Sequence, residues 1–523
     1  MHDVIVVGSG PAAVMAAREL QPLRILMLDV GFDAPPARLA AEPLHRARTR
    51  EDLTEPLIGV HFEALHNIER SYLSPKIKSP LMRFITREPD GTPPTLGDGF
   101  AAVYSYAKGG LANAWGAGVF RYDDHDLAGW PVSAAELAPH YDDLTRHIGV
   151  SGTQDDLTPY FGSTDDLQPP LPLSGTATRF LSAYARRRTR FHQHGIHVGR
   201  LRSAILTREH RGRPAHEIHN QEFFQPNLRS IYHPGYTLAE LRAANAVDYR
   251  EGFLVMRYRE IEGAVEISAR NIHTGDSETF TARHLILGAG AINSARIALA
   301  SADDHTTRLP ILDNLLSYVP LVDWRRVGAA LDVDGFTGAE LCMVYDGPLS
   351  VERVQGTFYG LAAPLRGDLF GELPLSLRGN VTALRYLIPA LGMLQLFYPD
   401  RPAASNYLRM TPDGGLEIHY AKRSFGVIER LLIDRFRSVG YLGLPGLVQY
   451  PLPGSSMHYA GTLPMRDAPR SRYESDRFGR LPGSGRVRVA DGAVFPLLPS
   501  KNHTFTIMAN AMRIARHLRE NLA

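Results

Sequence analysis

The sequence predicts an α/β protein, α+β overall, in which a Rossmann-like dinucleotide-binding domain is interleaved with a second domain built on an antiparallel sheet with helices. Three observations predict this class. A glycine-rich turn follows a β-branched run near the start, alternating apolar strands lie in the middle, and an apolar helical stripe lies near residue 510. The chain has 523 residues, which is enough for two or three domains.

Residues 3–29 carry a dinucleotide-binding fingerprint. The run DVIVV leads into Gly8, Gly10 and Ala13, which have the G-x-G-x-x-G/A spacing and open a helical segment. In this motif the first glycine permits a tight turn, the second lets the backbone approach a pyrophosphate, and the small third residue lets helix and strand pack closely. Asp29 ends the next apolar run, where a carboxylate can accept hydrogen bonds from a ribose diol. The pattern therefore predicts dinucleotide binding without separating FAD from NAD.

The middle of the chain is expected to return to the same sheet before a second domain begins. Residues 245–290 alternate as antiparallel strands and end in HLILGAG, after which AINSARIALA forms a helix. Residues 311–454 mix short strands and apolar helices with many prolines. Their longest apolar stretch, 381–398, contains Arg, Pro and Gln and is interpreted as buried protein, not a membrane span. Residues 32–95 lack steady periodicity and predict an excursion or lid.

The last segment places two polar residues in front of a helix. In SKNHTFTIMANAMRIA, Asn502 and His503 precede an apolar stripe, and Thr504 or Thr506 is expected to cap the helix. The members of the stripe repeat at helical spacing and are Ile507, Met508, Ala511, Ile514, Ala515 and Leu518. The helix N-terminus favours negative charge beside the Asn-His pair.

These segments resemble the glucose-methanol-choline (GMC) family of flavoprotein oxidoreductases, and its sugar-oxidising branches most. That family combines an N-terminal FAD fingerprint with a late His-x-x-Gly-Thr motif, an Asp-x-Ser-x-x-Pro segment, and an Asn-Pro or Ser-His step before the last helix. The counterparts here are His458 with Gly461 and Thr462, Asp491 with Ala493 and Pro496, and Asn502 with His503. Ala493 departs from the usual serine.

Two inner segments are similar to the same family. KGGLANAWG, residues 108–116, resembles its flavin-contacting Gly-Gly loop, and LILGAGAINSARIALA resembles a strand-turn-helix near the adenosine half. In some members a His in the loop bonds covalently to the flavin, and this chain has Ala114 at that spacing, so non-covalent FAD is expected. The resemblance implies cofactor contacts at Gly8, Gly10, Ala13, Asp29, Gly109, Gly110, Asn113, Ala114, Gly290, Asp491, Gly492 and Thr504.

The pattern of elements, together with the resemblance in the FAD-binding segments, predicts a division of the chain into two domains and a lid. The expected FAD-binding domain comprises residues 1–31, 96–150, 245–310 and 455–523. The expected substrate-binding domain comprises residues 151–244 and 311–454. Residues 32–95 are expected to form the lid or excursion.

The implied activity is FAD-dependent oxidation of an alcohol to a carbonyl, on a sugar-like, aminosugar or aminocyclitol substrate, with natural-product biosynthesis as one expected setting. Such a reaction needs a base at the hydroxyl, for which His458 is the candidate, and a second group that orients the same oxygen. Counting back from Thr506 favours His503 for this second role, and Asn502 stays open. Oxygen or another acceptor would take the electrons. Two alternatives are a hydroxylase or mutase whose flavin NAD(P)H reduces, and a non-catalytic FAD-binding protein.

Composition argues against other classes of function. A formal net charge of +2 gives no electrostatic case for nucleic acid or an anionic membrane. Cys342 is the only cysteine, so an internal disulfide or thiolate zinc site cannot form, and a cytoplasmic location is expected. The start enters a strand without a signal-peptide pattern, and the histidines of 191–199 lack the spacing of a zinc motif. DDHD at 123–126 is expected to be a solvated loop. The oligomeric state does not follow from the sequence.

Overall fold

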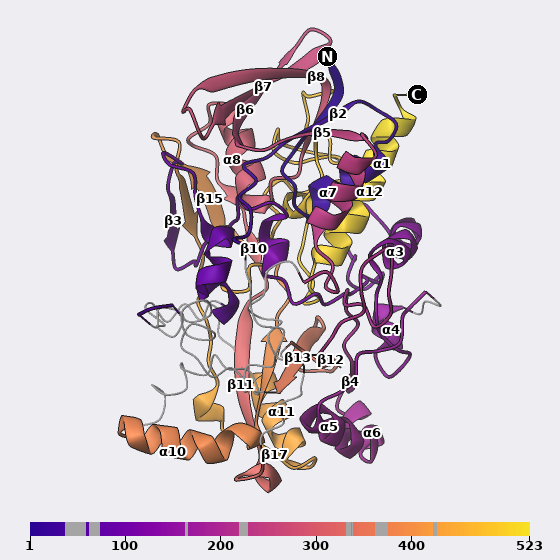
Figure 1. The fold of residues 1–523 in the computed structure, drawn as a ribbon, viewed down its shortest axis with the longest axis vertical. Coiled ribbons are helices and arrows are strands. Elements are labelled where there is room, and N and C mark those ends of the chain that lie inside the picture. The colour runs from indigo at the N-terminus through magenta and orange to yellow at the C-terminus, as the bar shows by residue number, and fades with distance from the viewer. Residues whose placement is uncertain are drawn as a thin grey trace.

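The computed structural model describes residues 1–36, 59–61, 74–162, 166–218, 228–330, 336, 338–360, 375–421 and 426–522. The molecule is elongated, and its two largest sheets lie toward opposite ends (Figure 1). Both chain termini lie at the end that contains the first strand (Figure 1).

A seven-stranded mixed sheet forms one end, in the order β5-β2-β1-β8-β7-β6, with β19 also paired to β8. Its parallel strands are β1 (His2–Val7), β2 (Ile25–Leu28), β5 (Val247–Arg250), β8 (Ser277–Leu287) and β19 (Val487–Val489). Its antiparallel strands are β6 (Phe253–Ile261) and β7 (Ala264–Asn271). The four β2 residues are all buried, as expected for a central parallel strand covered on both faces.

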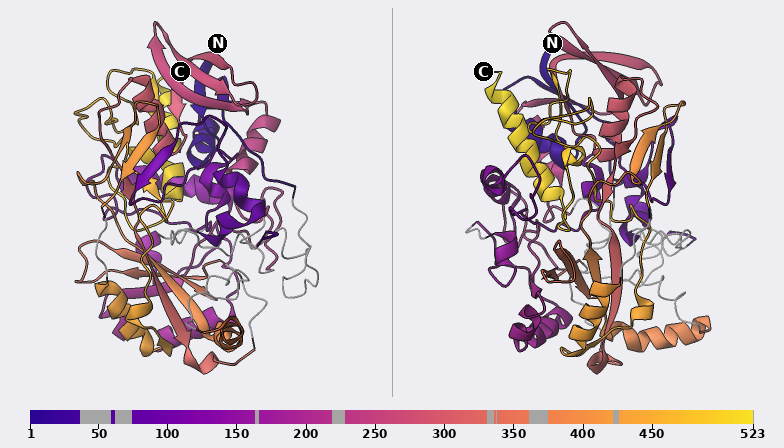
Figure 2. Two further views of the ribbon diagram at one scale, coloured as in Figure 1. Left: turned by 90° about the vertical axis from the view of Figure 1, so that its left-hand side faces the viewer. Right: turned by 180° about the vertical axis from the view of Figure 1, so that it is seen from behind.

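Helices from several parts of the chain pack on this sheet or on one another beside it. They are α1 (Pro11–Glu19), α3 (Ala134–Ile148), α7 (Pro234–Ala243), α8 (Ala291–Ser301) and α12 (Thr504–Glu520). The alanines of α1 allow α12 to approach closely, and α3 and α7 pack beside this pair. Figure 2 shows the C-terminal helix from two further sides. The first and last helices of the chain therefore form one layer.

A six-stranded antiparallel sheet forms the other end, in the order β17-β11-β14-β13-β12-β4. Its strands are β4 (Ile196–Arg200), β11 (Leu316–Asp323), β12 (Leu341–Tyr345), β13 (Val354–Gly360), β14 (Leu391–Phe397) and β17 (Tyr441–Leu442). The helices of this end are α4 (Thr158–Phe161), α5 (Gly175–Ala185), α6 (Arg188–His192), α10 (Leu377–Leu387) and α11 (Val427–Arg437). Burial alternates along β11 and through most of β14, so one face of the sheet packs in the core and the other is left partly accessible.

Two small sheets lie between these ends. One has the order β3-β16-β15-β9, formed by β3 (Thr95–Asp98), β9 (Leu309–Pro310), β15 (Tyr407–Met410) and β16 (Leu416–His419). The other pairs β10 (Leu312–Asp313) with β18 (Tyr459–Ala460). Short 3-10 helices are Pro75–Lys78, Pro80–Thr86, Gly110–Asn113, Trp324–Arg326, Ile388–Ala390, Pro445–Leu447 and Gly492–Val494. The β10–β18 pair brings the segment before β11 alongside the segment that carries His458.

The predicted fold class is confirmed by these sheets, because a mixed Rossmann-like sheet and an antiparallel sheet are built from alternating parts of the chain. The domain boundaries stay a prediction. Helix α7 packs on α1, and β15 and β16 pair with β3 and β9, although both segments fall in ranges expected to bind substrate. Much of the expected lid, residues 37–58 and 62–73, lies outside the described residues.

The apolar stretch 381–398 is only partly the buried segment that was expected. This stretch includes the last part of α10 and all of β14. Its helical part exposes Val381 and Tyr386, which are 50% and 56% accessible. A helix at the surface needs only one apolar face, which accounts for this difference. In the described parts of the chain, no helix combines the length and the hydropathy that a bilayer crossing requires.

Candidate active site

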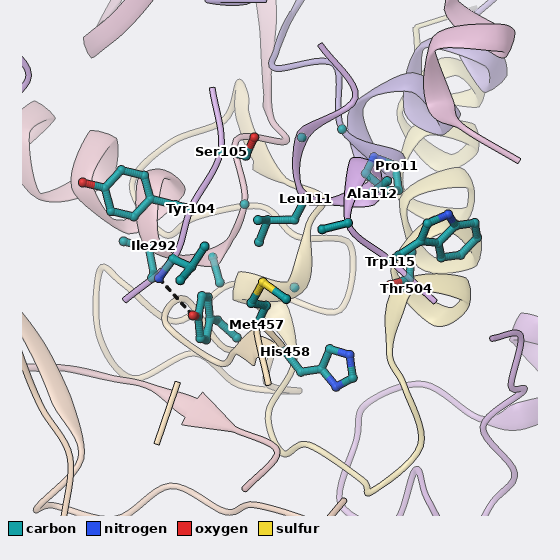
Figure 3. A pocket seen from close by; sticks show the side chains of 18 of the residues that line it. Pro11, Tyr104, Ser105, Leu111, Ala112, Trp115, Ile292, Met457, His458 and Thr504 are labelled. Atoms are coloured by element: carbon teal, nitrogen blue, oxygen red, sulfur yellow. Dashed lines mark hydrogen bonds between the residues drawn. The ribbon is translucent and has the colours of Figure 1, made fainter. Parts of the chain in front are cut away.

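A cavity of about 950 Å³ extends from the β1–α1 turn to the six-stranded sheet. Figure 3 shows Pro11, Leu111, Trp115 and His458 around this space. The fingerprint glycines line one end, and side chains of β11, β13 and β14 line the other. A single cavity therefore joins the predicted dinucleotide site to the sheet of the second domain.

The β1–α1 turn has the shape that its sequence predicts. Gly8 has φ +92°, and a Cβ there would come within 2.8 Å of the Gly288 carbonyl oxygen. A Cβ on Gly288 would in turn lie 2.9 Å from the Cβ of Ala13, so helix and strand leave no room for larger residues. On the open side, a Cβ at Gly10 would have no atom within 4 Å. The turn thus presents bare backbone to the cavity at the N-terminus of α1, as a pyrophosphate site requires.

Asp29 belongs to a hydrogen-bond chain that crosses the cavity wall. The Ser9 hydroxyl donates to Asp29 Oδ2, and the Tyr249 hydroxyl donates to the same oxygen at 3.1 Å. The Gly109 N–H donates to Ser9 Oγ at 2.9 Å. Burial raises the pKa of Asp29 to about 6, and the hydrogen bonds from Ser9 and Tyr249 oppose this rise. Ser9 therefore connects the fingerprint acid with the Gly-Gly loop.

The Gly-Gly loop needs both of its glycines. Gly109 has φ +89°, and a Cβ there would collide with the His233 ring at 2.3 Å. Gly110 has φ +59° and faces the fingerprint, since its Cβ would lie 3.6 Å from the Gly10 Cα. The Asn113 amide donates to the carbonyl oxygens of Lys108 (3.0 Å) and Gly110 (2.8 Å), which closes the loop.

The predicted cofactor residues divide into lining and supporting positions. Those that line the cavity are Gly8, Gly10, Asp29, Gly110, Ala114, Gly290, Asp491, Gly492 and Thr504. Three predicted residues do not line the cavity but contact the backbone or side chains of residues that do or that lie next to them. They are Ala13, Gly109 and Asn113.

Asp491 joins two backbone turns at the cavity wall. Its Oδ2 accepts hydrogen bonds from the Gly290 N–H (2.8 Å) and the Ser294 hydroxyl (2.5 Å). Its Oδ1 accepts from the Ala493 N–H at 2.9 Å. Burial raises the pKa of Asp491, and these donors oppose the rise. The carboxylate fixes the start of α8 against the segment that contains Gly492.

His458 and His503 lie together at the cavity, with ring centroids 5.0 Å apart. Burial lowers the pKa of His458 well below its usual value, and the nearby His503 lowers it further. Burial lowers the pKa of His503 to about 4, against a small opposing effect of the Tyr459 carbonyl. Both imidazoles are therefore neutral at pH 7 and can accept a proton.

Each ring has a distinct hydrogen-bond partner. His458 Nδ1 lies 3.2 Å from Asn314 Oδ1, and the Phe397 ring stacks on His458 at 5.3 Å. His503 Nε2 lies 3.3 Å from the Tyr459 carbonyl oxygen. A carbonyl can only accept, so Nε2 of His503 carries the proton, while its Nδ1 is buried without a protein partner. An unpaired buried acceptor at a cavity is a feature that a bound ligand can satisfy.

The segment before α12 is held by Lys501, which the sequence did not reveal. Its buried ammonium group donates to Asp126 and to the carbonyl oxygens of Arg121 (3.1 Å) and Tyr160 (2.5 Å). The expectation of a solvated loop at 123–126 was wrong for Asp126, which is 5% accessible and pairs with Lys501. Pairing with a buried cation stabilises a buried carboxylate.

The expectation that a threonine caps α12 was also wrong. His503 is the N-cap residue and makes no capping bond through its side chain. The Thr506 hydroxyl instead lies 2.8 Å from the Tyr141 hydroxyl, in the contact between α12 and α3. Asn502 Oδ1 is 3.2 Å from Gln355 Nε2 on β13, so both members of the Asn-His pair line the cavity.

Several residues of the site were missed by the sequence interpretation. Ser9 lies inside the fingerprint and could have been found there, because its hydroxyl follows the first glycine. Tyr318 and Gln395 have no motif around them, and strand pairing brings them to the cavity. Asn314 and Gln355 also lack a motif, and they contact His458 and Asn502. In the described part of the chain, no three His, Cys, Asp or Glu side chains gather as a metal site would require.

The glycine-rich turn at the N-terminus of α1 shares a cavity with two neutral histidines, an arrangement that suits a nucleotide-dependent oxidoreductase. Residues 449–511 match the family model described as GMC oxidoreductase. GMC oxidoreductases depend on flavin, and the protein is an alcohol-oxidising enzyme.

Known proteins are similar to this chain over most of its length. Paromamine 6'-oxidase of Streptomyces fradiae is 25% identical over 98% of this chain and 90% of its own. C-glycoside 3-oxidase of Microbacterium trichothecenolyticum is 24% identical over 99% of this chain and 97% of its own. The crystal structure of pyridoxine 4-oxidase from Mesorbium loti has a TM-score of 0.60 at 15% identity and covers 99% of each chain. This last similarity shows the fold.

Proposed function

We propose that the protein oxidises an alcohol group of a sugar-like, aminosugar or aminocyclitol substrate to a carbonyl, with non-covalently bound FAD as hydride acceptor. The observation that carries this proposal is the shared cavity, which is lined by the fingerprint glycines and by His458 and His503. An alcohol oxidation needs a proton acceptor and a hydride acceptor at one carbon, and a single continuous cavity can hold both.

The residues of the cradle fit FAD. Gly10 leaves open space for a pyrophosphate, and Asp29 at the end of β2 suits the ribose hydroxyls. The Gly-Gly loop lies against the fingerprint on the path toward the histidines. FAD, when bound, supplies an isoalloxazine ring that accepts a hydride from the substrate carbon. Ala114 offers no side chain for a covalent bond to the flavin, which supports non-covalent binding.

His458 acts as the base in this proposal. Its neutral imidazole takes the proton from the substrate hydroxyl as the C–H hydrogen leaves as hydride, so that the alcohol loses two electrons and two hydrogens. A low pKa in the free protein keeps the ring unprotonated before substrate binds. His503 and Asn502 both line the cavity and are the two candidates to orient the substrate oxygen.

The far end of the cavity supports a hydroxyl-rich substrate. Tyr318 on β11 is the register partner of Gln395 on β14, and the Gln395 amide donates to the Tyr318 hydroxyl at 3.3 Å. Gln449 lines the cavity nearby, together with Met393 and Phe397. Amides and a hydroxyl among apolar side chains form the type of surface that binds sugar hydroxyls. The names of the two full-length relatives, paromamine 6'-oxidase and C-glycoside 3-oxidase, agree with this class.

The cellular setting belongs to the same proposal. A single cysteine supports a reducing cytoplasm, and the balanced charge supports a small-molecule partner over nucleic acid. Similarity to paromamine 6'-oxidase supports a role in natural-product biosynthesis. Oxygen or another acceptor would reoxidise the flavin.

An anaerobic screen tests this proposal. Purified, FAD-loaded protein is mixed with sugars, glycosides, aminosugars and aminocyclitols, and bleaching of the flavin absorbance is followed. We expect bleaching by at least one of these alcohols and none by NADH or NADPH. Bleaching by NAD(P)H alone would indicate a hydroxylase or mutase, and bleaching by no compound would indicate a non-catalytic flavoprotein.

A second measurement tests how the flavin is held. After acid precipitation, the yellow colour is expected in the supernatant, because Ala114 cannot bond to the ring. Colour that stays with the washed pellet would contradict non-covalent binding.

A further inference from the structure

Asn314 is buried at the point where four segments meet. It lies between β10 and β11 and has no accessible surface. Its amide nitrogen donates to the carbonyl oxygens of Tyr398 (2.9 Å) and Pro499 (2.8 Å). Its amide oxygen lies 3.2 Å from Nδ1 of His458. The side chain thus uses both N–H groups and its oxygen at the same time.

The two carbonyl groups determine which way the Asn314 amide faces. Carbonyl oxygens can only accept hydrogen bonds, so the NH₂ group must point at Tyr398 and Pro499. The opposite orientation would place three oxygens against one another in a buried site, which is unfavourable. The Asn314 oxygen therefore faces His458, and the group opposite it must be a donor.

We propose that Asn314 is a positioning residue that fixes the tautomer of His458. Neutral imidazole carries one proton, and the Asn314 oxygen holds that proton on Nδ1. Nε2 then has the free lone pair that a substrate hydroxyl needs as proton acceptor. The inference rests on the proposed function of His458 as the base, and it names the atom that takes the proton.

The contact acts on the ring and not on the main chain of His458. The His458 N–H donates to Ser456 Oγ at 2.9 Å, and the Ser456 hydroxyl donates to Asp313. The Gly454 N–H also donates to Asp313, at 2.7 Å. This second network holds the backbone of the segment, so removing the Asn314 oxygen releases the imidazole alone.

The titratable and charged groups around His458 do not replace this contact. His503 is the ionisable neighbour that lowers the pKa of His458, and the two ring centroids are 5.0 Å apart. Phe397 stacks on the imidazole at an angle of 19° and has no hydrogen-bonding atom. Asn314 is thus the polar group that selects between the two ring nitrogens.

Nitrogen NMR of protein labelled with ¹⁵N-histidine tests the proposal directly. The His458 signals are assigned by their loss in His458→Gln, and the FAD-loaded protein is used without substrate. We expect a protonated Nδ1 and an unprotonated Nε2 at pH 7. A neutral ring with its proton on Nε2 would overturn the proposal. The NMR measurement of the tautomer does not depend on turnover, so it separates failure of this inference from failure of the proposed function.

Two substitutions extend the test to the reaction. Asn314→Leu removes the acceptor, and we expect a mixed tautomer and flavin reduction slower by about 10- to 100-fold, the range typical of lost supporting hydrogen bonds at active sites. Asn314→Asp keeps an acceptor oxygen opposite Nδ1 but places its second oxygen against the Tyr398 and Pro499 carbonyls, so some stability should be lost. Where the carboxyl is ionised, Nδ1–H should persist and the pKa that governs reduction should rise. A merely structural role predicts similar damage from both variants and no shift in the pH profile.

A matched control separates tautomer control from loss of a buried amide. Asn406 is also buried, at 2% accessibility, and its oxygen accepts from the Ala421 N–H at 3.1 Å away from the histidine pair. Asn406→Leu should leave the His458 signals and the reduction rate at the values of the unsubstituted protein. If Asn314→Leu does not fold, the wild-type spectrum still decides the question.

Discussion

The Gly109 N–H donates a 2.9 Å hydrogen bond to the Ser9 hydroxyl, although the two residues are 100 positions apart in the chain. The same hydroxyl donates to Asp29. The fingerprint, its acid and the Gly-Gly loop are therefore one connected unit, and a cofactor that touches all three depends on Ser9.

Replacement of Ser9 should weaken FAD binding. Ser9→Ala removes the donor to Asp29 and the acceptor for Gly109, and a lost hydrogen bond to a charged group costs about 1.5–3 kcal/mol. We expect the dissociation constant of FAD to rise by about 10- to 100-fold in a flavin fluorescence titration. Ser484→Ala, at a surface turn, is the control, and equal affinities for the two variants would refute the role of Ser9.

The affinity for FAD should increase as pH rises through about 6. The pKa of Asp29 is raised to about 6 by burial, so the carboxyl is protonated below this pH and ionised above it. An ionised carboxylate is the stronger acceptor for ribose hydroxyls. Titrations of the protein between pH 5 and 7.5 should show this dependence, and Asp29→Asn should abolish it. A dependence that is retained in the variant would point to another group.

Replacement of His458 should impair reduction of the flavin but not its binding. We expect His458→Gln to slow anaerobic reduction by about 10²- to 10⁴-fold, the usual contribution of a general base. The flavin absorbance per protein should stay unchanged, because the cradle residues are untouched. His305→Gln, at a partly exposed site, is the control. A reduction rate close to that of the unsubstituted protein would remove His458 from the reaction.

The rate of flavin reduction should be independent of pH from about 6 upward. The pKa of His458 lies well below 6.5 and that of His503 near 4, so acidification must go further than usual before either ring is protonated. The rate should therefore fall only at acidic pH, measured by stopped-flow with saturating substrate. An acid limb centred at 6.5 or above would contradict the buried, neutral pair.

Replacement of Gln395 should affect recognition of the substrate. Gln395→Leu removes amide contacts at the far end of the cavity, and a neutral hydrogen bond contributes about 0.5–1.5 kcal/mol, so KM for the best substrate should rise by about 2- to 10-fold. FAD affinity should not change. Tyr407→Phe on β15 provides a control away from the lining. An unchanged KM in Gln395→Leu would mean that this side chain does not contact the substrate.

The nucleotide-binding half could be predicted from sequence because its signals are local. Gly8, Gly10 and Ala13 carry their spacing and their strand-turn-helix context within a short stretch, and the backbone angles and packing in the structure match it. The position of α12 also followed from its apolar stripe. The spacing of residues within a short segment predicts the backbone geometry of that segment without information on distant residues.

The substrate half was less predictable because its contacts join distant strands. Tyr318 and Gln395 meet only through the pairing of β11 with β14, and Asn314 meets His458 only through β10 and β18. The register of such pairs is set by tertiary packing, which no short motif records. The threonine cap failed for a related reason, since Thr506 forms its hydrogen bond with Tyr141 on another helix.

Strand β19 and helix α12 come from the last part of the chain but complete the sheet and the helical layer that begin with β1 and α1. During translation, residues 487–520 leave the ribosome long after the fingerprint has emerged. The nascent chain therefore cannot close its nucleotide cradle early. If the cradle binds FAD as proposed, we expect flavin to load late, and premature stops near the carboxyl end should yield a colourless polypeptide.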